Sequence, residues 1–81
     1  MITKITIPEN VQTIDTSVFS NNHLTTVNIE AKKAPKVSKD SFGDDIILIT
    51  VPSCNNYISS DSYTDFTSVL YDNNGNKCLA S

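Results

Sequence analysis

Three segments of the sequence carry the same apolar pattern, and they begin at equal intervals, at positions 2, 24 and 46. Each segment has apolar residues at its first, fourth and sixth positions, and the segments are Ile2–Pro8, Leu24–Glu30 and Ile46–Pro52. A unit of this length cannot bury its own apolar face, so the copies must stack against one another. The spacing therefore predicts short parallel strands in which Ile5, Val27 and Ile49 are neighbours in one apolar column.

The second half of each unit also repeats. Val11, Ile14 and Phe19 correspond to Ala34, Val37 and Phe42, at an interval that one inserted residue makes slightly longer. The segments 15–19 and 38–42 begin with residues that cap helices and end in an aromatic residue, which predicts one helical or 3₁₀ turn in each, the second ending at Gly43. We expect the rings of Phe19 and Phe42 to stack in the core.

These residues resemble a known family. The pattern from Ile5 to Phe19, Ile-x-Ile-Pro-x-x-Val-x-x-Ile-x-x-x-x-Phe, is similar to the BspA-like leucine-rich repeat. Val51-Pro52-Ser53, Tyr57 and the segment 63–66 resemble the C-terminal closing unit of that family. The resemblance implies a mostly β chain with short helical turns. It would be a fragment of a right-handed leucine-rich-repeat solenoid, with short parallel strands at a period of about 22 residues.

We expect a single domain over residues 1–81. Repeat 1 would span 1–22, repeat 2 would span 23–45, a partial third repeat or closing unit 46–67, and a terminal hairpin 68–81. Asn74-Gly75 is a favoured centre for a two-residue type I′ turn. Closing the hairpin on that pair would place Asp72 opposite Lys77 and Tyr71 opposite Cys78, and this hairpin would cap the last strand.

No set of residues in the sequence indicates catalysis, so we expect no enzyme, no cofactor and no metal site. His23 follows Ser20-Asn21-Asn22 and is interpreted as an exposed turn residue, and no local motif supports a nucleophilic pair of Cys54 with His23. The segment from Asp72 to Asn76 lacks the glycine and glutamate positions of an EF-hand loop. Cys54 and Cys78 are either a disulfide or two half-buried thiols.

The charges argue against nucleic acid as a partner. Six basic and nine acidic residues give a formal net charge of −3, which excludes the electrostatic footprint of a nucleic-acid-binding protein. Lysines gather at Lys32, Lys33, Lys36 and Lys39, but Glu30, Asp40, Asp44 and Asp45 flank them, which is typical of a solvated face of mixed charge. No apolar run reaches the roughly 18 residues that span a bilayer, so we also expect no membrane insertion.

The remaining candidate for function is a surface. If the apolar residues of the strands point inward, the alternate residues point outward and line up across the strands. Repeat proteins use such rows as binding faces. The candidate binding residues are Lys4, Thr6, Thr26, Asn28, Glu30, Leu48 and Thr50. An equally weighted alternative is that this face binds nothing and that any partner surface lies in further repeats.

The resemblance implies a role as well as a fold. It suggests an extracellular or cell-surface protein whose C-terminal part serves protein binding or adhesion, with an unidentified protein ligand or host surface protein as partner. The alternative is a structural end-cap of a solenoid, or a module that self-associates as a homo-oligomer through the strand at residues 2–8. We expect no cap before that strand, which would leave its outer edge bare.

Overall fold

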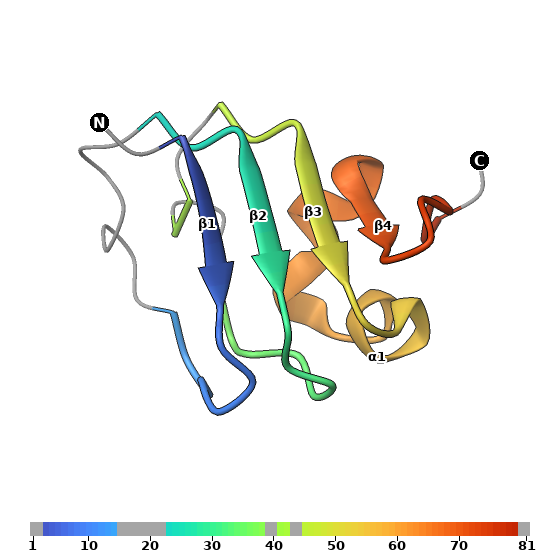
Figure 1. The fold of residues 1–81 in the computed structure, drawn as a ribbon. Helices are drawn as coiled ribbons and strands as arrows, with labels where there is room; N and C mark the ends of the chain where they lie inside the picture. Colours follow the sequence, from blue (N-terminus) through green and yellow to red (C-terminus); the bar gives the residue numbers. More distant parts are fainter. Residues whose placement is uncertain (1–2, 15–22, 39–40, 43–44, 80–81) are drawn as a thin grey trace.

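The computed structural model describes residues 3–14, 23–38, 41–42 and 45–79. Its centre is a four-stranded parallel sheet in the order β1-β2-β3-β4. The strands are β1 (Lys4–Ile7), β2 (Thr26–Ile29), β3 (Leu48–Val51) and β4 (Leu70–Asp72). Figure 1 shows β1 at one edge of the sheet and β4 with the C-terminal hairpin at the other.

The strand register follows the sequence pattern. Ile5 pairs with Val27, and Val27 pairs with Ile49, so the predicted apolar column is confirmed. Leu70 of β4 extends the column beside Ile49, although no fourth copy of the repeat pattern marks this strand in the sequence. Val27, Ile49 and Leu70 are fully buried, and burial of each such side chain stabilises the fold by about 1.5–3 kcal/mol. Ile5, on the edge strand, is only partly buried.

A second contact line lies behind the sheet, between the segments that follow β1 and β2. Thr13 and Lys36 form a parallel bridge. The Ile14 N–H donates to the Lys36 carbonyl at 2.8 Å, and the Lys36 N–H donates to the Gln12 carbonyl at 2.9 Å. The buried Ser41 hydroxyl adds a bond of 3.0 Å to the Ile14 carbonyl. The core therefore lies between the sheet and these extended segments.

The expectation of a mostly β chain is corrected to a mixed α/β structure. The α-helix α1 (Cys54–Ile58) and the 3₁₀ helix η1 (Asp61–Val69) follow β3 almost without interruption. Figure 1 shows them packed behind the β3–β4 end of the sheet. Tyr63 and Phe66 are buried and lie one turn of a 3₁₀ helix apart. Helices thus fill the place that extended segments occupy behind β1 and β2.

Aromatic rings join these helices to the rest of the core. Phe42 is fully buried, and its ring centroid lies 5.7 Å from that of Phe66 in an edge-on arrangement. Tyr57 and Tyr63 make a second edge-on pair at 5.0 Å. The predicted partner of Phe42, Phe19, lies outside the described residues, as do the whole of the turn expected at 15–19 and part of the turn expected at 38–42.

The C-terminal hairpin is present, but its register differs from the prediction by one residue. Tyr71 pairs with Lys77, and the Cys78 N–H donates to the Leu70 carbonyl at 2.9 Å. The Gly75 N–H donates to the Asp72 carbonyl, and the Asp72 N–H donates to the Asn76 carbonyl, which makes a three-residue loop. Gly75 takes the positive φ of 86° that closes such a loop with a bulge.

A disulfide resolves the two alternatives for the cysteines. Cys54, the first residue of α1, is bonded to Cys78 in the returning arm of the hairpin, and the two Cα atoms are 5.0 Å apart. The bond closes a loop across 24 residues. It ties the hairpin, which pairs with the outer edge of β4, to the helix that follows β3.

Candidate binding face

The outward residues of the strands form rows across the sheet, as the pattern predicted. Thr6 pairs with Asn28, Asn28 pairs with Thr50, and Thr50 pairs with Tyr71 of β4. We call Thr6, Asn28, Thr50 and Tyr71 the middle row. The sequence prediction missed Tyr71, because it placed this residue in a separate hairpin rather than in the fourth strand. Its position one residue after the inward Leu70 was the available signal.

The middle row is polar and partly ordered by its own hydrogen bond. The Thr50 hydroxyl donates to the Asn28 side-chain oxygen at 2.7 Å. This bond assigns the amide oxygen of Asn28 as an acceptor and leaves its NH₂ group, which has no hydrogen-bond partner among the described residues, as a donor to a ligand. Thr6 is exposed, and Asn28, Thr50 and Tyr71 are half-buried.

A second row precedes the first along the strands. Lys4 pairs with Thr26, and Thr26 pairs with Leu48. Lys4 is exposed, whereas Thr26 and Leu48 are half-buried. Glu30 directly follows β2 and is exposed, and its backbone N–H donates to the Ile7 carbonyl at 2.9 Å. The structure therefore brings six of the seven predicted residues into two adjacent rows and places Glu30 just beyond the strand end.

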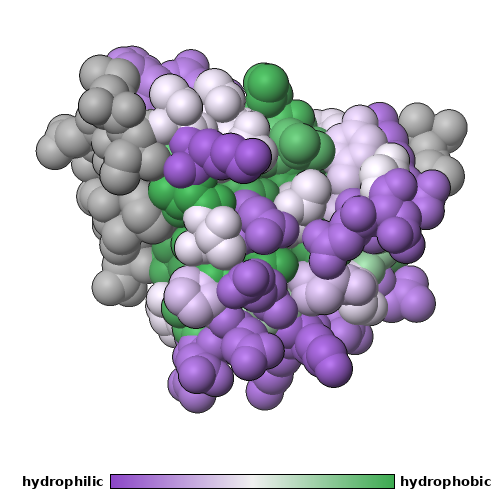
Figure 2. Space-filling model, viewed as in Figure 1, coloured by the Kyte–Doolittle hydropathy of each residue, from purple (hydrophilic) through white to green (hydrophobic). Residues whose placement is uncertain are grey.

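Figure 2 shows this side of the molecule as a mixture of hydrophilic and hydrophobic surface, with a hydrophobic area near the start of β3. Ile47 immediately precedes β3 and is 69% exposed, the highest value among the large apolar residues of the described chain. A face that offers hydroxyls, an amide, an ammonium group and an apolar patch suits a protein surface. It provides no charge density of the kind that a polyanion requires.

His23 pairs with Asp45 at the end of the sheet where the strands begin. The His23 Nδ1 and the Asp45 Oδ2 are 2.9 Å apart, and both side chains are more than half exposed. Cys54 cannot act with His23 as a nucleophile, because its sulfur is bonded to Cys78. His23 is thus an exposed residue that is hydrogen-bonded to the residue 22 positions later. Such a pair contributes little when it lies in water.

The carboxylate of Asp72 is hydrogen-bonded within the hairpin loop. The Asp72 carboxylate accepts bonds from the backbone N–H groups of Asn74 and Asn76, at 2.8 and 2.9 Å, and from the Asn76 side chain. These bonds hold the pKa of the Asp72 carboxyl below its usual value, and the bond from the Asn76 backbone N–H has the largest effect. A carboxylate that already accepts three bonds is a turn-forming group rather than a free cation ligand.

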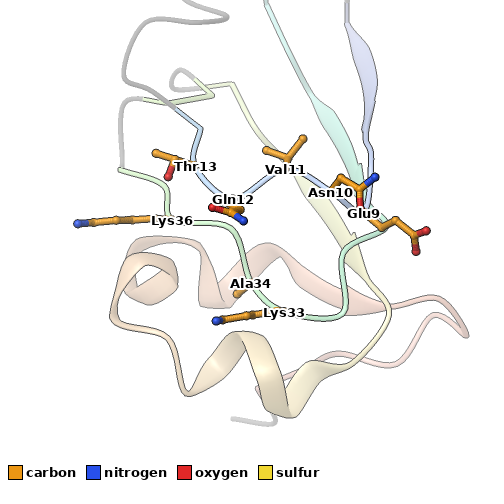
Figure 3. Close-up of a pocket in the computed structure, with 8 residues that line it drawn as sticks. All are labelled: Glu9, Asn10, Val11, Gln12, Thr13, Lys33, Ala34 and Lys36. Carbon is orange, nitrogen blue, oxygen red and sulfur yellow. The ribbon is translucent and has the colours of Figure 1, made fainter.

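A groove lies beyond the C-terminal ends of β1 and β2 and apart from the two rows. It has a volume of about 600 Å³, and the residues that follow the two strands form its walls. One wall is the segment 9–13 and the other is the segment 33–36. In Figure 3 the side chains of Lys33 and Lys36 extend to the same side, whereas the Glu9 carboxylate points to the opposite end. The sequence pattern gave no indication of this groove.

Within the described residues, no cluster of three or more His, Cys, Asp or Glu side chains is arranged to hold a metal ion. The helices of this part of the chain are too short and too polar to cross a membrane. No protein-family model matches the sequence, and no curated protein matches it closely enough to count as a relative.

Proposed function

We propose that the two outer rows of the sheet form a protein-binding face of an extracellular or surface-attached module, the C-terminal part of a leucine-rich-repeat solenoid of the BspA-like type. The observation that carries the proposal is the alignment of Thr6, Asn28 and Thr50 in consecutive parallel strands, at equal steps along the sequence. Repeated units that present equivalent polar side chains on one face are the arrangement that repeat proteins use for recognition.

Three further features support this proposal. The disulfide between Cys54 and Cys78 fits a chain that folds in an oxidising compartment, outside the cytosol. The strands are short, and β1 and β2 are each followed by a segment that lies behind the sheet, which fits stacked units of a solenoid. A terminal element that pairs with the last repeat strand fits the capping that such arrays need.

The test uses the T6R/T50R double variant, which places two bulky charges in the middle row. Its control is S68R/N73R, which adds the same charge at exposed positions outside the rows. Both variants and the native chain are immobilised and tested by biolayer interferometry against a panel of purified extracellular host proteins. We expect the native chain and S68R/N73R to bind the same panel member, and T6R/T50R to lose that binding. Equal binding by both variants would contradict the proposal and favour a structural end-cap.

A specific observation favours self-association through β1 as the second candidate function. β1 is an edge strand, and Ile5 is only partly buried while the residues in line with it on β2 and β3 are fully buried. The carbonyls of Thr3 and Ile7 accept bonds from the β2 side. Since backbone groups alternate in direction along a parallel strand, those of Lys4 and Thr6 face the open edge.

The edge is tested with the variant Thr6→Pro, which removes an outward N–H without removing a bond to β2. Analytical ultracentrifugation over a concentration series should show a native dimer and a monomeric variant. A native chain that stays monomeric at the highest concentration contradicts self-association through this strand.

A further inference from the structure

We propose that the groove between residues 9–13 and 33–36 is a second binding site, which takes an extended acidic peptide segment. This site is independent of the outer rows of the sheet, because none of its lining residues belongs to them. The inference therefore does not rest on the proposed function of the sheet face. Its basis is the charge of the groove, the way its walls are held, and the chemistry of its lining.

The charge of the groove comes from lysines that have no acidic partner among the described residues. Four of the six basic residues of the chain lie within positions 32–39, and Lys33 and Lys36 line the groove. Both are exposed, and the carboxylate of Asp45 is hydrogen-bonded to His23 rather than to either lysine. Two ammonium groups that have no acidic partner in the described part of the chain thus lie on one side of the groove (Figure 3).

The wall that carries these lysines is held by side chains from the helices. The Tyr57 hydroxyl donates to the Ala31 carbonyl, and the Tyr63 hydroxyl donates to the Pro35 carbonyl at 2.8 Å. The Asn56 amide adds a bond of 2.9 Å to the Lys32 carbonyl. Because these bonds fix the backbone before any ligand arrives, binding would not incur the entropy cost of ordering this wall.

The facing wall is joined to the first by backbone bonds. The Lys36 N–H donates to the Gln12 carbonyl and the Lys36 carbonyl accepts from the Ile14 N–H, so the two walls keep a constant spacing. Asn10 and Gln12 bring side-chain amides to the groove, and amides both donate to and accept from a peptide backbone. Val11 and Ala34 are half-buried apolar residues on the two walls.

The lining favours a peptide over other anionic ligands. No aromatic side chain of the described chain lines the groove, so it lacks the stacking platform that nucleic-acid bases use. Glu9 repels carboxylates at one end while the two lysines attract them at the other, so the acidic residues of the peptide lie at the lysine end.

The experiment uses a fluorescein-labelled hexaglutamate peptide as the probe and a labelled hexaglutamine peptide as its neutral match. Fluorescence anisotropy is measured with the native chain, with K33Q/K36Q and with K32Q/K77Q, which removes the same charge from residues that do not line the groove. We expect hexaglutamate, but not hexaglutamine, to bind the native chain and K32Q/K77Q alike. K33Q/K36Q should bind about tenfold more weakly, since each exposed ion pair contributes roughly threefold. Glu9→Gln should strengthen binding.

Two binding results would overturn the proposal, and so would one NMR result. One is an equal loss of binding in K33Q/K36Q and K32Q/K77Q, which would mean attraction by net charge alone. The other is a sulfated oligosaccharide probe that binds more tightly than hexaglutamate and depends on the same two lysines. Amide NMR shifts provide a second readout: on addition of hexaglutamate they should be confined to the segments 9–13 and 33–36. Shifts confined to the strands would place the probe on the sheet face and contradict the groove site.

Discussion

The hydroxyl of Tyr63 donates a hydrogen bond of 2.8 Å to the backbone carbonyl of Pro35, which lies 28 residues earlier in the chain. Both residues are fully buried, so water cannot replace the bond. Burial also raises the pKa of the Tyr63 hydroxyl well above its usual value, as expected for a phenol that must stay neutral. The bond ties η1 to the wall of the groove.

Tyr63→Phe should therefore destabilise the protein with little change in its core volume. The variant leaves the Pro35 carbonyl buried without this partner, which costs about 1–3 kcal/mol. Urea unfolding followed by circular dichroism measures the change in the free energy of unfolding. The control is Tyr71→Phe, at a half-buried position on the outer face, which should change stability by less than about 0.5 kcal/mol. Equal effects would mean that the Pro35 bond is unimportant.

The same chemistry predicts a loss of stability at alkaline pH. Burial raises the pKa of Tyr57 to about 12 from a usual value of 10.0. Because the folded state favours the protonated phenol, the contribution is complete below pH 10 and is lost as the pH rises toward 12. Urea unfolding at several pH values should show the decline, and Tyr57→Phe should make it shallower. An unchanged slope in the variant would assign the alkaline loss to other groups.

Neighbouring positions around β3 test the orientation of the strands. Ile49 is fully buried, whereas Ile47 is 69% exposed. Ile49→Ala should cost about 2–5 kcal/mol, because it removes methylene groups from a packed core and leaves a cavity. Ile47→Ala removes the same atoms from a solvated position and should change stability by less than about 0.5 kcal/mol. Thermal and urea unfolding measure both, and similar costs would contradict the register of β3.

Reduction of the disulfide should destabilise the edge of the sheet that β4 and the C-terminal hairpin form. A bond that closes a loop across 24 residues stabilises a folded chain by about 3 kcal/mol in the loop-entropy model. Dithiothreitol should lower the melting temperature of the native chain, and the C54S/C78S variant should melt lower and ignore the reductant. Hydrogen exchange should rise first at the Cys78 N–H, which bonds to Leu70. An equal rise in hydrogen exchange across all four strands would mean that the disulfide does not stabilise this edge locally.

The positions of the first three strands and their pairing were predictable from the sequence. Apolar residues alternate with polar ones in β1 and β2, and the inward apolar positions recur at a constant interval through β3. The inward faces of these three strands and the rows of the candidate face therefore follow from side-chain parity. No similar repeat follows Val51, which explains why the two helices and the fourth strand could not be predicted from the sequence. Residues 54–69 carry no strand pattern, and their helices form around Tyr57, Tyr63 and Phe66, which are buried against residues far away in the sequence.

Only the folded chain decided the contacts that have no local signature. The pairing of Cys54 with Cys78 and the tyrosine bonds to the carbonyls of residues 31 and 35 join distant parts of the sequence, and they depend on which segments the core brings together. The hairpin is shifted by one residue because the Asp72 carboxylate accepts bonds from two backbone N–H groups of the loop. The Asn74-Gly75 pair alone does not indicate these bonds. The cationic groove has the same origin. The sequence shows a run of lysines, but only the packing of the segments 9–13 and 33–36 places two of these lysines at one groove.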